Sequence, residues 1–161
     1  MKIGIIADTH DNITAIKKAV LFFNTQDLEY IIHAGDFVAP FSLKELMHVK
    51  ARFIGVFGNN DGEQKGLLGV CNDIHIPPYT ITIDGKTILV SHMPEMLTGS
   101  VNIENIDIII SAHTHTPEIS RGKPLCINPG ECCGWVSGKS TVALLNLKTF
   151  HAEIVDLSSV S

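Results

Sequence analysis

The first sixty residues alternate short apolar runs with segments of helical periodicity. The apolar runs lack polar alternation, which is typical of strands buried on both faces of a sheet. These runs are Lys2–Ala7, Tyr30–Ala34 and Arg52–Phe57. Apolar residues recur at helical spacing over residues 13–23, and Asp11 or Asn12 is placed to cap that helix. Ser42 and Glu45 have the spacing of a capping box, which predicts a second helix beginning near Ser42. The resulting β-α-β-α-β order predicts a parallel sheet.

The remainder of the chain is richer in expected strands. Thr80–Ile83 and Thr87–Ser91 flank Asp84-Gly85, a hairpin turn signal. Further strands are expected at Ile106–Ser111, Ile119–Arg121, Leu125–Asn128, Thr141–Leu147 and Ala152–Leu157. Gly62–Pro78 has no clear period, and part of it is expected to be helical. Because one parallel sheet needs fewer strands, the predicted fold class is α/β, with two stacked mixed β-sheets flanked by helices.

Composition and charge narrow the class of protein. The 161 residues are 45% hydrophobic and 18% charged, which suits one globular domain over residues 1–161. A net charge of -5 without a Lys/Arg-rich run argues against a nucleic-acid polymer as partner. No stretch has the length of a membrane span, and the N-terminus lacks a signal-peptide pattern, so we expect no membrane association and a cytoplasmic location. The four cysteines form no C-x-x-C pair and are expected to be reduced, mostly buried thiols.

Polar residues that can bind metals follow five of the expected strands. They are Asp8-Thr9-His10, Gly35-Asp36, Gly58-Asn59-Asn60-Asp61, Ser91-His92 and His113-Thr114-His115. Taken singly, Asp8 fits a turn or helix cap better than a ligand, and His92 fits a buried, hydrogen-bonded histidine. In α/β sheets, however, ligands bind beyond the carboxyl ends of the strands. The occurrence of every element at a strand end therefore predicts that they meet in one crevice.

The chemistry of this set predicts a metal site. The seven expected ligands are Asp8, His10, Asp36, Asn59, His92, His113 and His115. Two carboxylates, four imidazoles and one amide suit borderline divalent metals better than Mg or Ca. Mn is the first choice, and Ni, Fe, Co and Zn also fit. Seven ligands are too many for one catalytic metal with an open position, so two divalent ions are expected.

The ordered motifs resemble the calcineurin-like metallophosphoesterase superfamily. They are Asp8-x-His10, Gly35-Asp36, Gly58-Asn59-x-Asp61, His92 and His113-x-His115. His33-Ala34-Gly35-Asp36 and Asn128-Pro129-Gly130 resemble its compact prokaryotic phosphodiesterase branch. The resemblance, which runs to about Gly130, implies a sandwich of two β-sheets flanked by helices. It also allocates the ligands: Asp8, His10 and His115 to a first metal, Asn59, His92 and His113 to a second, and Asp36 to both.

The same chemistry suggests a reaction. Two metals about 3.5–4 Å apart can clamp the attacking and leaving oxygens of a phosphate ester, with a bridging hydroxide as nucleophile. Two dications, two carboxylates and one hydroxide leave a single positive charge, which suits a phosphodiester monoanion better than a monoester dianion. We therefore expect hydrolysis of small phosphodiesters. The alternatives are a non-catalytic protein-binding scaffold, like the retromer-subunit relative of this family, and a structural metalloprotein that binds metal without turnover. The substrate and any homo-oligomer stay open.

One position departs from the family pattern. Many larger members have Gly-Asn-His where this chain has Gly58-Asn59-Asn60, and that histidine is thought to protonate the leaving group. Asparagine is no general acid, and such assistance is typically worth about 10²–10⁴ in rate. Slow turnover and a preference for leaving groups of low pKa are therefore expected. The predicted catalytic set is Asp36, Asn59, Asn60, Asp61 and His92.

Several other residues carry weaker expectations. Asp61 and His33 are expected to orient the ligands from behind. His48 is expected on a helix surface and His151 near a late turn, so neither is a predicted ligand. Trp135, next to Cys132-Cys133-Gly134, is expected in the buried core, with a contact or a pocket wall as the alternatives.

Overall fold

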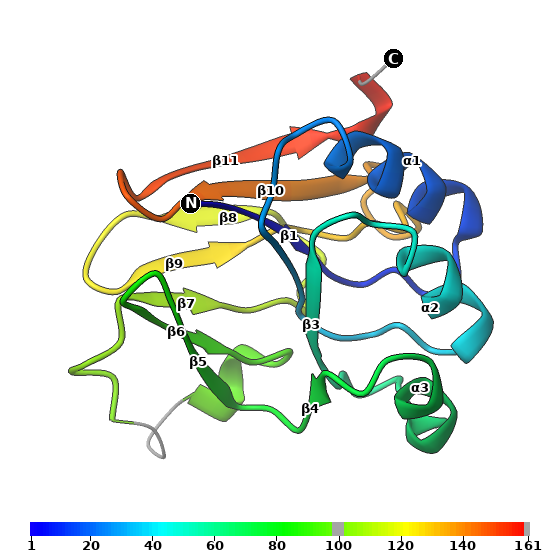
Figure 1. Cartoon of the computed structure of the whole chain (residues 1–161), viewed down its shortest axis with the longest axis horizontal. Helices are drawn as coiled ribbons and strands as arrows, with labels where there is room; N and C mark the ends of the chain where they lie inside the picture. Colours follow the sequence, from blue (N-terminus) through cyan, green and yellow to red (C-terminus); the bar gives the residue numbers. More distant parts are fainter. Residues whose placement is uncertain (98–101, 160–161) are drawn as a thin grey trace.

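The computed structural model describes residues 1–97 and 102–159 and places two β-sheets face to face (Figure 1). The six-stranded sheet has the order β11-β10-β1-β2-β3-β4, and the five-stranded sheet has the order β5-β6-β7-β9-β8. The strands of the first sheet are β1 Lys2–Ile6, β2 Tyr30–His33, β3 Arg52–Val56, β4 Ile74–His75, β10 Thr141–Asn146 and β11 His151–Asp156. Those of the second are β5 Tyr79–Ile83, β6 Lys86–Val90, β7 Ile108–Ile110, β8 Glu118–Ser120 and β9 Leu125–Asn128.

Both sheets are mixed. In the six-stranded sheet, β1 to β4 pair in parallel, whereas β10 pairs antiparallel with β1 and with β11. In the five-stranded sheet, β6, β7 and β9 run parallel, and the antiparallel strands β5 and β8 form the two edges. The predicted α/β class with two stacked mixed sheets is confirmed.

The hydrophobic core has two main layers. Buried residues of both sheets pack against each other between them, among them Ile5, Ile88 and Ile110. The second layer lies between the six-stranded sheet and the helices α1 Ile13–Phe23, α2 Pro40–Leu46 and α3 Gln64–Val70. A small third cluster, which includes Leu97 from the 3₁₀ helix η1 Pro94–Leu97, covers part of the outer face of the five-stranded sheet. A second short 3₁₀ helix, η2 Leu157–Ser159, follows β11.

The helix starts differ in part from the sequence interpretation. Asn12 caps α1, because its side chain accepts a hydrogen bond from the Ala15 amide. The expected start of α2 at Ser42 is wrong, since the helix begins at Pro40, whose fixed φ suits a first turn. Ser42 lies buried within α2, and its hydroxyl donates to the Ala39 carbonyl instead of capping the helix.

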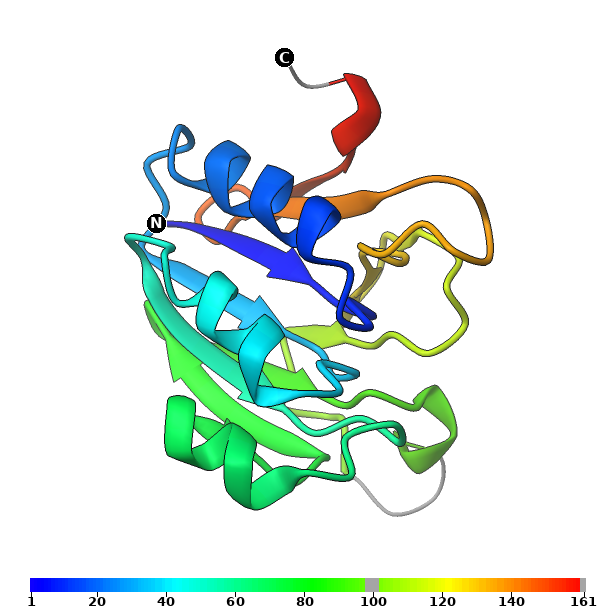
Figure 2. The same cartoon turned by 90° about the vertical axis from the view of Figure 1, so that its right-hand side faces the viewer.

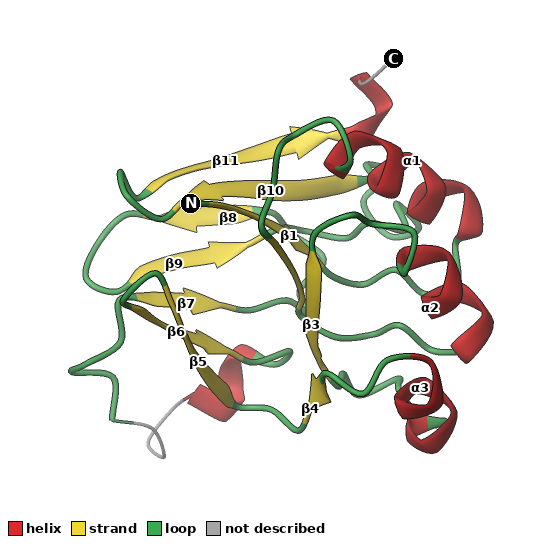
Figure 3. Cartoon of the chain, in the orientation of Figure 1, coloured by secondary structure: helices red, strands yellow, loops and turns green. Residues whose placement is uncertain are grey.

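The connections after the strands define one edge of the molecule. The loops that follow β1 and β2 gather on the right of Figure 2, and they are among the green segments of Figure 3. The loops after β3, β6, β7 and β9 reach the same edge, as the contacts described below show. This common edge brings residues far apart in sequence into one site.

None of the helices in residues 1–97 and 102–159 has the length and apolarity to cross a bilayer.

Candidate metal centre

The loops at this edge are joined by backbone hydrogen bonds. The Asp8 amide donates to the Gly35 carbonyl at 3.0 Å, and the His10 amide donates to the Asp36 carbonyl at 3.1 Å. From the loop after β9, the Cys133 amide donates to the Asp8 carbonyl at 3.0 Å. The side chains of the site therefore start from a backbone that is fixed by several strands at once.

Backbone strain is concentrated at this edge. Asp8, His10, Asp36, His113 and His115 all have φ between 40° and 69°. This left-handed region is uncommon for residues other than glycine, and it persists only where surrounding contacts enforce it. Such outliers often gather at functional sites.

Asp8, His10 and His115 form the first group of converging side chains, which we call the Asp8 cluster. The Nε2 atom of His10 lies 3.7 Å from Oδ1 of Asp8, and Nε2 of His115 lies 3.5 Å from the same oxygen. These distances are too long for hydrogen bonds. Oδ1 of Asp8 and Nε2 of His10 are consequently buried without any hydrogen-bond partner. A buried polar atom without a partner is costly, and a cation among these three ligands would satisfy both atoms.

Glu131 holds His115 in place from outside the cluster. The Nδ1–H of His115 donates to Glu131 Oε2 at 2.9 Å, which leaves the Nε2 lone pair facing Asp8. Burial would raise the pKa of Glu131, but hydrogen bonds from Ser137, Cys133 and His115 hold it well below its ordinary value. The same carboxylate accepts the backbone amides of Trp135, Val136 and Ser137.

Asp36, Asn59 and His92 form the second group, which we call the Asp36 cluster. His92 donates through Nδ1–H to the Ala34 carbonyl at 2.9 Å. In the neutral ring Nε2 then carries a lone pair. It faces Oδ1 of Asn59 at 2.9 Å and Oδ2 of Asp36 at 3.3 Å. Burial alone would lower the pKa of His92, but Asp36 raises it above its ordinary value, because a proton relieves the convergence of acceptors. A metal ion would relieve it equally.

The carboxylate of Asp36 connects the two clusters. Its Oδ2 atom lies 3.5 Å from His10 Nε2 and 3.3 Å from His92 Nε2. Asn60 holds this carboxylate twice, through its backbone amide at 2.9 Å and its side-chain amide at 2.7 Å. Although burial would raise the pKa of Asp36, the protonated form of His92 and the hydrogen bonds from Asn60 keep it well below its ordinary value. Gly58 is required beside it, since a Cβ there would collide with the carboxylate.

Asp61 shapes the backbone beneath the Asp36 cluster. Its carboxylate is buried and accepts the backbone amides of Asp36, Gly58 and Val38 at 2.7–3.0 Å. Burial raises the pKa of Asp61 despite these hydrogen bonds. Val38 itself has a φ of 83°, which is a strained value for a β-branched residue. Asp61 thus ties the loop after β2 to the loop after β3.

His33 and Thr9 lie behind the centre. The Gly35 amide donates to Nδ1 of His33 at 3.1 Å, so Nε2 carries the proton and faces the Thr9 hydroxyl at 3.2 Å. That hydroxyl donates in turn to the Asp36 carbonyl at 3.3 Å. Burial lowers the pKa of His33 well below its ordinary value, so the ring stays neutral. His33 is thus linked to the backbone of Asp36 and not to its carboxylate.

The seventh expected ligand, His113, joins the group less directly. Its ring lies edge-on to His92, with ring centroids 5.2 Å apart. Its backbone amide donates to Asp8 Oδ2 at 3.3 Å. The structure therefore brings six expected ligands into close polar contact and places the seventh beside His92.

Two contributors were missed by the sequence interpretation. Glu131 carried no signal of its own, although it directly follows the quoted Asn128-Pro129-Gly130 motif. Asn128 donates to the carbonyl of Ala112 at 3.2 Å and to the Thr114 hydroxyl at 3.0 Å. It thereby fixes the loop that carries His113 and His115. A carboxylate and an amide flanking a turn at a strand end could have been read as a further element of the pattern.

The expectation for Trp135 is wrong. Its side chain is 65% exposed, because the backbone of its loop turns inward to the buried carboxylate of Glu131 and the indole is left on the outer side. The indole lies roughly parallel to the ring of His10, with centroids 6.2 Å apart. The four cysteines are free thiols, and burial raises the pKa of Cys132 and of Cys133 to about 12, so both stay protonated.

Three histidines that are not predicted ligands, His48, His75 and His151, lie outside the two clusters. His48 follows α2 and is exposed, and His151 is exposed at the start of β11. His75 stacks on Tyr79, with ring centroids 3.8 Å apart, and contacts Asp73 at 2.7 Å.

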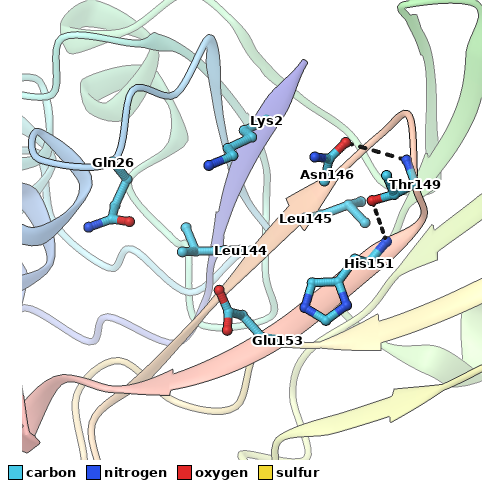
Figure 4. A pocket seen from close by; sticks show the side chains of 8 residues that line it. All are labelled: Lys2, Gln26, Leu144, Leu145, Asn146, Thr149, His151 and Glu153. Carbon is cyan, nitrogen blue, oxygen red and sulfur yellow. Dashed lines mark hydrogen bonds between the residues drawn. The ribbon is translucent and has the colours of Figure 1, made fainter.

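A hollow of about 260 Å³ lies toward the opposite end of the six-stranded sheet, where β1 begins. Figure 4 shows Lys2, Asn146, His151 and Glu153 around it, at the start of β1 and at the turn between β10 and β11. Among the described residues, none of its lining side chains belongs to a group able to hold a metal ion. Within residues 1–97 and 102–159, the groups that could hold a metal ion therefore lie at the carboxyl ends of the parallel strands.

The chain is similar to known proteins over most of its length. Residues 1–149 match the calcineurin-like phosphoesterase superfamily domain. The chain is 37% identical to a phosphodiesterase of Methanocaldococcus jannaschii, over 96% of this chain and 99% of that protein. A solved archaeal phosphodiesterase superposes with a TM-score of 0.88 at 33% identity, covering 97% and 99% of the two chains. Vps29 of Entamoeba histolytica, solved with zinc, shares the fold with a TM-score of 0.71 at 18% identity, covering 98% and 99%.

Proposed function

The chain belongs to the calcineurin-like phosphoesterase superfamily, and on that premise we propose that it is a metal-dependent phosphodiesterase acting on small phosphodiesters. Its metals would be two divalent ions, one in the Asp8 cluster and one in the Asp36 cluster, with Asp36 shared. The single observation that carries the proposal is the pair of buried atoms without partners, Asp8 Oδ1 and His10 Nε2, in the middle of converging ligands.

The donor set supports the metal assignment. Asp8, His10 and His115 offer one oxygen and two nitrogens within 4.8 Å of one another. Asp8, Asp36 and His92 form a second such group, and Asn59 adds an amide oxygen beside His92. Mixed nitrogen and oxygen ligands favour Mn, Fe, Co, Ni or Zn, of which we propose Mn first. When bound, the two ions would lower the pKa of a water molecule and offset the charge of the phosphate.

The charge of the site favours a diester. Asp8 and Asp36 are not the only buried carboxylates near the centre. Glu131 is a third, and only the imidazole ring of His115 separates it from the Asp8 cluster. It reduces the net positive charge that two dications would leave. A site with less positive charge disfavours a monoester dianion relative to a phosphodiester monoanion.

The residues around the centre orient the ligands and do not supply a proton. Asn60 donates two hydrogen bonds to Asp36 and so fixes the shared carboxylate. It is exposed beside the Asp36 cluster, and its amide cannot act as a general acid. We therefore propose that turnover favours leaving groups that need no proton, such as nitrophenolate.

A direct assay tests the proposal. Purified protein is freed of metal with a chelator, and hydrolysis of bis-p-nitrophenyl phosphate is measured with and without Mn²⁺. We expect nitrophenolate release that requires the metal and that is lost in Asp36→Ala. Metal-independent release, or equal release by Asp36→Ala, would contradict the proposal. The absence of any hydrolysis with Mn²⁺ would favour a protein-binding scaffold of the same fold.

A further inference from the structure

A second hollow opens directly beside the Asp36 cluster. It has a volume of about 270 Å³. Its lining comes from the loop after β3, the start of α3, the segment between β4 and β5, and the segment after β6. The lining residues are Phe57, Gly58, Asn59, Gln64, Ile76, Pro77, His92, Met93 and Met96. Two of the proposed metal ligands, Asn59 and His92, thus form part of its wall.

The surface of this hollow is mainly apolar. Phe57 and His92 are buried, whereas Ile76 is 78% exposed and Met96 is 36% exposed. Among the described lining residues, none except His92 can carry a charge near neutral pH. Large apolar side chains that stay exposed around a concave site favour an apolar occupant, because its binding removes them from water.

The hollow is continuous with the metal centre. Nε2 of His92 lies 3.3 Å from the shared carboxylate of Asp36 and 2.9 Å from Asn59. A phosphate bound at the Asp36 cluster would therefore extend one of its ester groups into this space. The ester group bonded directly to that phosphate is long enough to enter the hollow.

We propose that this hollow binds one uncharged aromatic ester group of the substrate, and this inference rests on the proposed phosphodiesterase function. Aromatic rings suit the site because Met93 and Met96 offer polarisable sulfur atoms for contact with a ring. A further phosphate or carboxylate on that group has no Lys or Arg to meet among the described lining residues. The volume lies slightly below the range of about 300–1,000 Å³ for drug-sized ligands, so a single ring system fits better than a long chain.

The methionine methyl groups offer a test that does not depend on turnover. The chain has four methionines, of which Met93 and Met96 line the hollow, while Met1 and Met47 lie elsewhere and serve as internal controls. Zn²⁺-loaded protein is diamagnetic, so its methionine methyl NMR signals can be followed during titration with diphenyl phosphate. We expect ring-current shifts at the Met93 and Met96 methyls and none at the Met1 and Met47 methyls. Dimethyl phosphate, which lacks a ring, should not produce them.

A matched pair of variants extends the test. Ile76→Asp places a charge at the apolar rim and should weaken diphenyl phosphate binding about tenfold, because an apolar contact is replaced by a group that must be desolvated. Leu21→Asp makes the same change at an exposed leucine of α1, outside the hollow, and should leave binding unchanged. Isothermal titration of both variants gives the dissociation constants.

The outcomes separate this inference from the proposed function. Shifts that spread equally over all four methyls, no shifts at all, or unchanged binding by Ile76→Asp would overturn the aromatic subsite. Each of these could occur in a protein that hydrolyses bis-p-nitrophenyl phosphate with Mn²⁺. Conversely, shifts confined to Met93 and Met96 in a protein without hydrolysis would support the subsite while contradicting the enzyme.

Discussion

The Asp8 cluster and the Asp36 cluster use similar side chains but differ in how those side chains are satisfied. In the Asp8 cluster, Asp8 Oδ1 and His10 Nε2 are buried without partners. In the Asp36 cluster, the ligand atoms contact one another, since His92 Nε2 lies 2.9 Å from Asn59 and Asp36 accepts two hydrogen bonds from Asn60. A metal entering the first cluster would satisfy two atoms that lack partners, whereas a metal entering the second would first require His92 Nε2 and Asn59 Oδ1, which lie 2.9 Å apart, to move apart.

This difference predicts an order of binding. The Asp8 cluster should bind its metal first and more tightly, because its ligands are already separated and its atoms lack partners. The Asp36 cluster should bind more weakly, because the contact of His92 with Asn59 has to open. Four substitutions test this difference between the clusters.

The largest effect is expected for Asp36→Asn, which should weaken metal binding at both clusters. Asp36 Oδ2 lies within 3.5 Å of both His10 Nε2 and His92 Nε2, so its charge serves both clusters. Hydrolysis of bis-p-nitrophenyl phosphate should fall about 10³-fold or more, and the metal content should drop at both clusters. Elemental analysis and initial rates measure this. Asp84→Asn, the same change in the hairpin turn between β5 and β6, is the control, and a similar loss there would point to unfolding.

Glu131→Gln should act on one cluster alone. The amide keeps the shape of the carboxylate but loses the charge that orients His115, so metal affinity at the Asp8 cluster should fall about 10–100-fold. Affinity at the Asp36 cluster should stay the same. Calorimetric titration with Mn²⁺ gives the affinity of each cluster. Glu153→Gln on β11 is the matched control. Equal weakening at both clusters would mean that Glu131 supports the whole edge and not His115 in particular.

Asn60→His tests the missing general acid. A histidine beside the Asp36 cluster could donate a proton to a poor leaving group, a role typically worth about 10²–10⁴ in rate. Because the variant also loses the Asn60 side-chain bond to Asp36, we expect a net gain of about tenfold for diphenyl phosphate and little gain for bis-p-nitrophenyl phosphate. Steady-state rates with both esters decide this. If the two esters respond alike, the account of Asn60 is wrong.

The smallest effect is expected for Thr9→Val. The change keeps the shape of the side chain but removes the hydroxyl between His33 and the Asp36 carbonyl. The free energy of unfolding should fall by about 1–3 kcal/mol, because a buried donor is left unpaired. Metal affinity at both clusters should change less than about threefold, since no ligand atom is touched. Urea unfolding and calorimetry give the two values, and a strong loss of metal affinity would place Thr9 in the centre itself.

The sequence predicted the sheets and the convergence of six polar side chains for a common physical reason. Apolar runs such as Lys2–Ala7 identify buried strands, and polar residues directly after them must meet where parallel strands end. Six expected ligands come together in this way. The structure adds what spacing alone could not give, which is the shared position of Asp36 between His10 and His92.

What the sequence could not predict depends on contacts made in space. Glu131 looked like a loop residue, and its role appears only because three successive amides and His115 turn toward it. Trp135 was expected inside because of its apolar ring, but the loop that Glu131 fixes keeps it at the surface. The start of α2 at Pro40 follows from proline geometry, which competed with the Ser42 pattern.

The most direct test of the proposed dinuclear centre is a titration of activity against bound metal. Metal-free protein receives Mn²⁺ in steps from zero to three equivalents, and the rate of bis-p-nitrophenyl phosphate hydrolysis is measured beside the metal bound per chain. We predict little activity while the first equivalent fills the Asp8 cluster, and a rise to full activity with the second. Full activity at one bound equivalent, or activity in the metal-free protein, would contradict the account.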